Sequence, residues 1–282
     1  MLFHLTTSEV FIPDGVPVEA ALKRTTHLAI AAHQDDIEIM AGKPILDCFQ
    51  QPDRWFTGVV VTDGRGSPRD DLYAKYSDEE MRLVRFKEQK KAAVVGEYSA
   101  QVLLDYPSKV VKDGSDPKPV EDIVKLLKMT TPQFVYTHNL ADKHDTHVAV
   151  ALRVITAIRS LPESSRPLKV YGCEVWRALD WLVDSDKVSF DLSAHENLQA
   201  ALLGVFDSQI AGGKRYDLAT QGRRRANATY YASHGVDESV AMSYGMDLTP
   251  LIMDPSLDIS RYVQGYIDRL SVDVAERLRR MG

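Results

Sequence analysis

The sequence of 282 residues predicts an α/β protein with a Rossmann-like, three-layer α/β/α fold, a mostly parallel sheet and a largely helical C-terminal portion. The first observation behind this prediction is the alternation of short apolar runs with longer amphipathic runs over the first two thirds of the chain, which is typical of strand–helix–strand units. The second is that the chain after residue 193 reads mostly as helix. The composition, 44% hydrophobic and 26% charged, is that of an ordinary globular protein with a sizeable core.

Five segments are short, apolar and abruptly ended, as buried strands are, namely residues 26–33, 55–64, 100–106, 132–139 and 169–179. Helical patterns cover residues 37–51, 77–96, 119–130, 145–160 and 259–282. The clearest helix is 77–96, because Ser77 can cap it, Glu80 completes a capping box and Gly96 can end it. The segment 211–231 is rich in glycine and arginine, and we expect a mobile connection there.

Charge and sequence patterns limit the possible partners and locations. The formal net charge of -6 argues against a nucleic-acid partner, which requires a basic surface. No apolar run approaches the roughly 18 residues of a membrane span. The N-terminus lacks the basic and apolar regions of a signal peptide, and two isolated cysteines form no disulfide framework. We therefore expect a cytoplasmic protein.

Three polar clusters follow predicted strands. His33, Asp35 and Asp36 come directly after the first strand, residues 62–66 come after the second, and residues 138–147 come after the fourth. Ligands of open parallel sheets bind outside the carboxyl ends of the strands. The three clusters are therefore expected to meet at one edge of the sheet.

The residue types in these clusters favour a metal site. His144 and His147 are three residues apart near a helix start, so both rings can point one way, and His33 and Asp36 have the same spacing. A mixed His/Asp set with an open position suits a catalytic zinc, although iron, cobalt or nickel would also be accepted. One of the two adjacent carboxylates can then bind the metal while the other acts as a base.

The segment "AHQDDIEIMAG", followed by "DKHDTH", resembles the motifs AHPDDxExxxGG and HPDH of the PIG-L/LmbE-like family of zinc-dependent N-acetylglucosaminyl de-N-acetylases. Three further segments, "VVVTDGRG", "VRFKEQKKAAVVG" and "GVFDSQ", resemble later family segments in the expected order. The resemblance implies a single domain over residues 1–282. Its motif-bearing part covers about residues 25–212, and a helical C-terminal extension covers about residues 236–282.

The sequence departs from the family motifs at three positions. Gln34 replaces a proline that stiffens the turn after the first strand. Thr146 stands where the family has an aspartate before the last histidine, which removes a carboxylate that could orient an imidazole. Phe206 replaces a histidine that is often found two residues before the serine of the SQ segment.

Position by position, the resemblance implies that His33, Asp36 and His147 bind zinc. Asp35 would be the general base that takes a proton from the zinc-bound water. Zinc and a protonated His144 would stabilise the oxyanion that forms when this water attacks the acetamide carbonyl. The amine would leave with a proton from Asp35 or His144.

The resemblance also implies that Arg85 contacts the sugar, and that Asp63 and Gly64 line the neighbouring loop. The function implied is zinc-dependent removal of an N-acetyl group from an N-acetylglucosamine-type sugar or glycoconjugate, by a protein that assembles as a homo-oligomer. Two alternatives stay open, a metal-dependent hydrolase of another amide or ester and a non-catalytic sugar-binding member of the family. A nucleotide-binding function is disfavoured, because the first strand ends in HQDD rather than a glycine-rich loop.

Ordinary structural roles are expected for three neighbours of these residues. His138 is expected to be structural rather than a metal ligand, because histidines near strand and helix ends commonly pack or cap. Trp176 is expected in the core. Arg82 lies on a charged helix, where a solvated position is the default.

Overall fold

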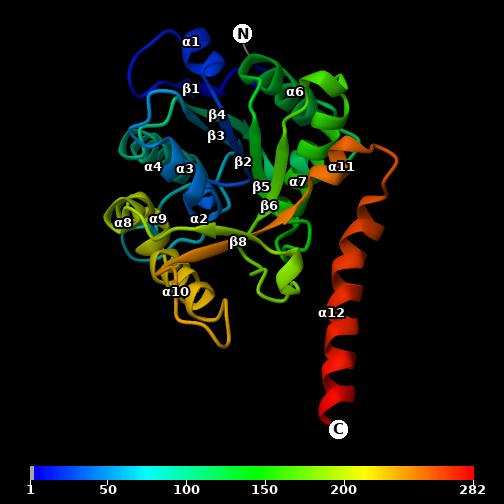
Figure 1. Ribbon diagram of the computed structural model, residues 1–282. Coiled ribbons are helices and arrows are strands. Elements are labelled where there is room, and N and C mark those ends of the chain that lie inside the picture. The colour runs from blue at the N-terminus through cyan, green and yellow to red at the C-terminus, as the bar shows by residue number, and fades with distance from the viewer. Residues whose placement is uncertain (1–2) are drawn as a thin grey trace.

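The computed structural model describes residues 3–282, and a single eight-stranded sheet with helices on both faces forms its body (Figure 1). The strands are β1 (Glu9–Phe11), β2 (His27–Ala31), β3 (Phe56–Thr62), β4 (Ala100–Tyr106), β5 (Phe134–His138), β6 (Lys169–Cys173), β7 (Val188–Asp191) and β8 (Met242–Asp247). All five predicted strands are present, as β2 to β6.

The sheet is mixed, so the prediction of a mostly parallel sheet is wrong in this respect. The strand order is β1-β4-β3-β2-β5-β6-β8-β7. The central strands β4, β3, β2, β5 and β6 run parallel, whereas β1 pairs with β4, and β8 with both β6 and β7, in antiparallel fashion. The antiparallel strands lie outside the regular strand–helix alternation from which the parallel sheet was predicted.

The helices are α1 (Val18–Lys23), α2 (Asp36–Met40), α3 (Gly42–Cys48), α4 (Asp78–Val95), α5 (Ser108–Lys112), α6 (Lys118–Thr130), α7 (Asp145–Arg159), α8 (Glu196–Gly204), α9 (Asp207–Ile210), α10 (Tyr216–Thr229), α11 (Thr249–Met253) and α12 (Ile259–Met281). The predicted capping box of α4 is present. The segment expected to be a mobile connection is largely helix α10, so that expectation is wrong.

Alternate residues of each central strand face opposite sides of the sheet, and both sides are buried. In β2, Leu28 and Ile30 belong to the core on one face, and Ala29 and Ala31 to the core on the other. Two-sided burial explains why the strands read as continuous apolar runs.

The chain adds β3 and β4 on one side of β2 and then places β5 on the other side. This reversal makes the gap between β2 and β5 the switch point of the sheet, where ligands bind in folds of this kind. The turn after β2 and the loop before α7 therefore meet there.

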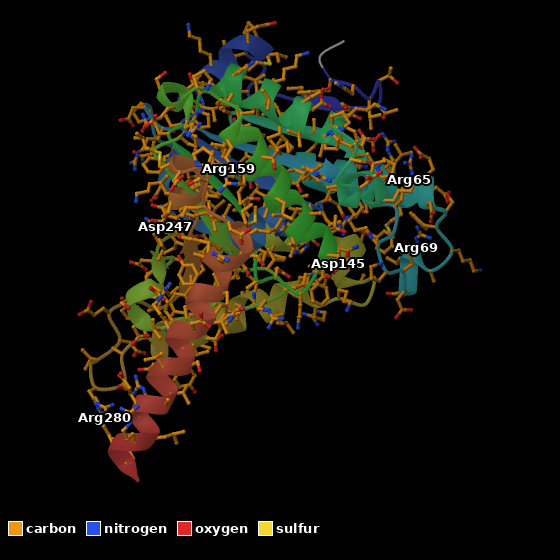
Figure 2. All side chains as sticks on the ribbon, turned by 90° about the vertical axis from the view of Figure 1, so that its right-hand side faces the viewer. Arg65, Arg69, Asp145, Arg159, Asp247 and Arg280 are labelled. Carbon is orange, nitrogen blue, oxygen red and sulfur yellow. The ribbon has the colours of Figure 1, made fainter. Side chains whose placement is uncertain are left out.

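The C-terminal helix α12 extends away from the body, and Arg280 marks its far end in Figure 2. The same view shows Arg65 and Arg69 on the loop after β3. Among residues 3–282, no helix has the length and the apolar character that crossing a membrane would require.

Candidate metal centre and active site

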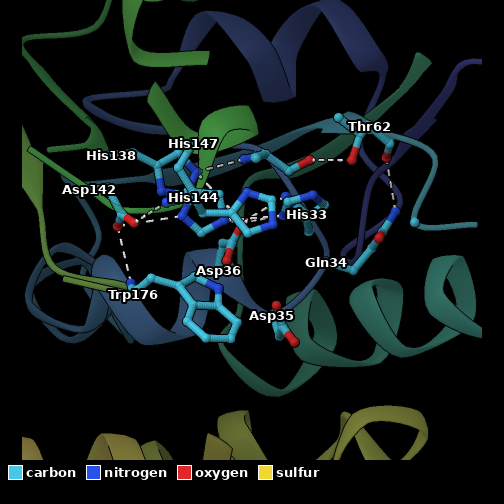
Figure 3. A network of polar contacts seen from close by, with 12 residues as sticks. His33, Gln34, Asp35, Asp36, Thr62, His138, Asp142, His144, His147 and Trp176 are labelled. Atoms are coloured by element: carbon cyan, nitrogen blue, oxygen red, sulfur yellow. Dashed lines mark hydrogen bonds and ion pairs between the residues drawn. The ribbon is translucent and has the colours of Figure 1, made fainter. Parts of the chain in front are cut away.

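The turn after β2 holds Asp35 in an unusual backbone conformation, with φ at 90°. Aspartate tolerates positive φ better than most residues, but the conformation still has to be held in place. The Asp35 N–H donates to Gln89 Oε1 at 3.2 Å, and Arg85 donates to the carbonyl of Gln34. Gln34 Nε2 donates to the carbonyl of Thr62 at 3.1 Å (Figure 3). A side-chain hydrogen bond thus braces the turn where the family has a proline ring.

The loop after β3 comes very close to this turn. Gly64 has a φ of +72°, which favours glycine, and a Cβ at this position would displace the side-chain amide of Gln34. Asp63 is turned the other way, toward the Arg65 guanidinium at 3.0 Å. Gly64 lines the cavity described below, whereas Asp63 does not.

The three residues predicted as metal ligands form a compact triangle of donor atoms (Figure 3). His33 Nδ1 lies 3.2 Å from Asp36 Oδ2 and 3.2 Å from His147 Nε2, and the latter two atoms are 3.3 Å apart. Tetrahedral zinc, with bonds of about 2.0–2.1 Å to nitrogen and oxygen, places its ligand atoms about 3.3 Å from one another. The spacing of these three atoms therefore fits such an ion.

Asp142 supports this triangle from outside. Its Oδ2 lies 3.5 Å from His147 Nδ1 and accepts a hydrogen bond from the Trp176 N–H at 3.1 Å, while its Oδ1 accepts from the His144 N–H at 3.0 Å. A carboxylate behind a metal-binding histidine fixes the ring orientation. The sequence analysis predicted no role for Asp142. His144 Nδ1 is buried and has no hydrogen-bond partner among the described residues. Thr146, which stands where the family has an aspartate, supplies no carboxylate for it.

His138 is close to the triangle but is engaged by the backbone. Its Nε2 accepts a hydrogen bond from the Ala32 N–H at 2.8 Å, and its ring stacks on His147 with centroids 3.9 Å apart. Burial and the neighbouring His147 hold the pKa of His138 well below its usual value, so this ring is neutral. This bond uses the lone pair of the nitrogen that lies 3.6 Å from Asp36 Oδ2. His138, Asp36 and His147 nonetheless lie close enough together to hold a metal ion, so the structural role of His138 stays a prediction.

Within the triangle, a proton on His147 balances the negative charge of Asp36. Burial lowers the pKa of His147, but the carboxylates of Asp36 and Asp142 outweigh it and raise that pKa to about 9. Burial likewise raises the pKa of Asp36, but His147 and His33 outweigh it and hold the pKa well below the usual value. A metal that binds here must displace the proton on His147.

Asp35 is buried, at 5% exposed, yet its carboxylate is poorly partnered. Its Oδ2 accepts no hydrogen bond and lies 3.6 Å from the Arg85 guanidinium. Burial is the main cause that raises the pKa of Asp35 to about 7, with a contribution from Asp36, while Arg85 opposes the rise. A carboxylate with such a pKa can take up and release a proton near neutral pH.

His144 faces the same space, with its ring centroid 5.0 Å from that of His33. Burial, together with His147 and His33, lowers the pKa of His144 to about 4. At neutral pH the ring is therefore uncharged in this structure, in contrast to the protonated ring that the resemblance implied.

These residues open onto a cavity of about 510 Å³. Its lining includes His33, Asp35, Asp36, Gly64, Arg85, Lys112, His144, Trp176, Gln209, Lys214 and Tyr216. Trp176 thus packs against the core, as expected, and also lines the cavity, which was not predicted.

The SQ segment and helix α4 meet at the cavity wall. The Ser208 N–H and hydroxyl both donate to the Glu88 carboxylate, at 2.7 and 2.6 Å. This contact ties the SQ segment to α4 and places Gln209 in the cavity lining beside Arg85. Arg85 Nε and Nη1 and Gln209 Nε2 are buried without acceptors among the described residues. Two residues of the wall therefore carry buried donors that the described residues leave without a partner.

Comparisons with known proteins identify a family for part of the chain and solved structures with the same fold. Residues 28–158 match the family model described as PIG-L, GlcNAc-PI de-N-acetylase. A comparison with curated proteins gives no match.

Solved structures with the same fold include the conserved protein TT1542 from Thermus thermophilus, 16% identical, with a TM-score of 0.63 over 83% of this chain and 99% of that chain. N,N'-diacetylchitobiose deacetylase from Pyrococcus horikoshii is 15% identical, with a TM-score of 0.62 over 84% and 88%. GalB, the 4-carboxy-2-hydroxymuconate hydratase from Pseudomonas putida, is 15% identical, with a TM-score of 0.60 over 80% and 97%. At these identities the similarity shows the fold alone.

Proposed function

Because residues 28–158 of this chain belong to the PIG-L family, we propose that the protein is a metal-dependent hydrolase that removes the acetyl group from an N-acetylglucosamine-type sugar or glycoconjugate. The observation that carries the proposal is the triangle of His33, Asp36 and His147 donor atoms with the buried carboxylate of Asp35 beside it, whose Oδ2 accepts no hydrogen bond. The Asp35 carboxylate does not help the fold, because a buried carboxylate without full partners reduces stability.

His33, Asp36 and His147 would hold the metal, for which zinc is the first candidate. When bound, such an ion supplies Lewis acidity that polarises the amide carbonyl and acidifies water. Asp142 keeps the His147 ring oriented for this role.

Asp35 is the proposed base. In its ionised form it takes a proton from the water that attacks the acetamide carbon. Once protonated, it can return that proton to the leaving amine, since a pKa of about 7 allows both steps. Because Asp35 itself returns the proton to the amine, no second protonated group is required before the reaction begins.

His144 is proposed to donate a hydrogen bond to the developing oxyanion as a neutral imidazole. Arg85 and Gln209 are proposed to bind sugar hydroxyls through their free donors, and Gly64 allows the sugar to approach the backbone. Asp63 is proposed only to hold the loop after β3, through its contact with Arg65.

The sugar substrate class is supported by the family description and by the deacetylase from Pyrococcus horikoshii with the same fold. The hydratase GalB also has this fold, so the fold by itself does not choose the reaction. Hydrolysis of another amide or ester stays an alternative that the substrate panel below distinguishes. Self-association and a cytoplasmic location stay predictions.

The test is amine release from a panel of N-acetylated sugars, N-acyl amino acids and acetyl esters. The purified protein, the chelator-treated protein and the zinc-restored protein are compared, with magnesium addition as the control for non-specific cation effects. Release of amine from sugars that is lost with chelator and restored by zinc supports the proposal. If the protein binds metal stoichiometrically but hydrolyses only esters or non-sugar amides, the sugar substrate class is wrong. If it binds no metal, the whole proposal is overturned.

Metal affinity provides a second check because it depends on His147. Since the metal displaces a proton from a ring with a pKa of about 9, affinity should rise about tenfold per pH unit below that value. Calorimetric zinc titrations across neutral pH measure this slope.

A further inference from the structure

The C-terminal half of α12 projects from the body with little support (Figure 1). The first half is held by the body, since the Tyr262 hydroxyl donates to the carbonyl of Asp247 at 2.6 Å and Arg269 Nε donates to Asp186 at 2.5 Å. Every residue but one in the range 271–282 is exposed. Isolated helices shorter than about 12–15 residues are marginal in water, so a partner would stabilise this half of α12.

One face of this helix carries an apolar stripe that the body leaves largely uncovered. The stripe of α12 consists of Ile267, Leu270, Val274, Leu278 and Met281. Successive members are three or four residues apart, and this spacing places them on one face of a helix. Leu270 is partly buried against the body, whereas the other four side chains are 42%, 47%, 69% and 82% exposed, in chain order. Such a face is typical of a helix that packs against another helix.

The order of the spacings makes the stripe self-complementary. From Ile267 to Met281 the steps are three, four, four and three residues, so the pattern is the same from either end, with Val274 at its centre. When two copies of the helix pair antiparallel about Val274, Ile267 of each copy faces Met281 of the other, and Leu270 faces Leu278. A two-fold interface between identical chains requires this kind of self-complementary surface.

The charges near the stripe favour the antiparallel arrangement. Arg279 and Arg280 lie in the last turn of α12, whereas the loop that lies against the middle of the helix carries Asp180 and Asp184. A parallel pair would bring the two arginine-bearing ends together, and like charges repel. The antiparallel pair separates these ends and brings each one to the level of the acidic loop of the other copy.

We propose that the stripe of α12 is a dimer interface, in which two copies of this chain pair their C-terminal helices antiparallel about Val274. The inference does not depend on the proposed enzymatic activity, because no residue of the stripe lines the cavity. One pair of helices forms a smaller contact than a standard interface, which buries about 1,200–2,000 Å². We therefore expect a reversible dimer whose fraction rises with protein concentration.

Sedimentation velocity of the full chain over a range of concentrations tests for this dimer. Val274→Glu places two like charges against each other at the two-fold axis and should raise the dissociation constant about tenfold or more. Val272→Glu is the matched control, because Val272 lies on the opposite side of the same helix and is 55% exposed, against 47% for Val274. It should leave the dissociation constant unchanged. Circular dichroism of both variants at concentrations where the parent is monomeric verifies that they are folded.

Cysteine cross-linking tests the orientation of the two helices. Val274→Cys should form a disulfide between two copies on oxidation with diamide, because the antiparallel arrangement brings these two positions together. Leu278→Cys should not, since its two copies lie eight residues apart along the helix pair, which is about 12 Å. The native cysteines Cys48 and Cys173 are buried and do not compete for the oxidant.

Three outcomes would overturn the proposal. The first is a protein that stays monomeric at every concentration, or a dimer that Val274→Glu leaves intact. The second is cross-linking of Leu278→Cys as complete as that of Val274→Cys, which would indicate parallel helices. The third is a monomer that binds vesicles of anionic phospholipid and loses this binding in Val274→Glu, which would assign the stripe to a membrane surface instead.

Discussion

Arg82 and Arg85 lie one turn apart on α4, each beside an aspartate, and the two pairs are built in opposite ways. Arg82 binds Asp105 through two hydrogen bonds of 2.7 Å and also reaches Glu79 at 2.9 Å. Arg85 instead lies 3.6 Å from Asp35, and two of its nitrogens have no acceptor. Both arginines are buried, at 7% and 2% exposed, so the solvated position expected for Arg82 is wrong.

The Arg82–Asp105 pair therefore serves the fold, whereas the Arg85–Asp35 pair is available to a ligand. A closed, bidentate pair satisfies both partners and leaves nothing for a substrate. An open pair leaves buried polar atoms without partners, which reduces stability unless a ligand completes it. The Arg85 pair is next to the metal triangle, whereas the Arg82 pair is outside the cavity lining.

The largest expected effect comes from Asp35→Asn, which removes the base and keeps the shape of the side chain. We expect kcat/KM for amine release to fall about 10³-fold, in the range found for general bases. Stability should stay the same or increase, because a desolvated carboxylate is removed. Steady-state kinetics and thermal unfolding of the same preparation measure both, and retained turnover would exclude Asp35 as the base.

Arg82→Met tests the closed pair. It leaves the buried Asp105 carboxylate without its cation, so we expect the free energy of unfolding to fall by about 3–5 kcal/mol. The folded variant should keep its kcat/KM, because Arg82 does not line the cavity. Urea unfolding measures the change in stability. A large loss of activity with little loss of stability would show that the Arg82 pair serves the site rather than the fold.

Arg85→Met tests the open pair, and the opposite balance is expected. kcat/KM should fall about 10- to 100-fold through loss of substrate positioning, with a smaller loss of stability than in Arg82→Met. Arg85 also lowers the pKa of Asp35, so its removal should raise that pKa. The acidic limb of the kcat/KM profile should then move to higher pH, and an unshifted limb would contradict the pairing.

Glu38 shows a third way to bury a carboxylate, and the expected effect of changing it is on stability rather than on activity. It has no cation but accepts hydrogen bonds from Gln89 Nε2 at 2.8 Å and the Tyr98 hydroxyl at 2.7 Å. Burial, opposed by these bonds, raises its pKa from 4.5 to about 8. The folded protein therefore holds this proton where the unfolded chain releases it, and stability falls as pH rises between these values.

Glu38→Gln should remove that pH dependence. Relative to the parent protein, the variant should gain about 1.4 kcal/mol per pH unit over the range between the two pKa values. Urea unfolding of chelator-treated samples at a series of pH values measures the gain. A constant difference between the two proteins would show that Glu38 is ionised in the folded state.

Much of the site could be predicted from local sequence. His33 and Asp36 share one turn, and His144 and His147 share one helix start, so their spacing alone brings each pair together. The strand–helix alternation also predicted which loops would meet. Trp176 and Lys214 gave no such signal, because they come from segments whose position depends on how the chain returns to the sheet after β6.

The sequence by itself determined the central parallel strands and the capped helix α4, because these depend on local periodicity. The choice of His33, Asp36 and His147 as the proposed metal ligands came from the family resemblance. Only the tertiary structure decided the antiparallel edges of the sheet, the role of Asp142 behind His147 and the contrast between Arg82 and Arg85. The sequence does not distinguish two arginines on one helix. Which of them forms a bidentate ion pair depends on where β4 places Asp105 and where the turn after β2 places Asp35. Long-range packing, rather than residue type, therefore separates the structural arginine from the one that faces the cavity.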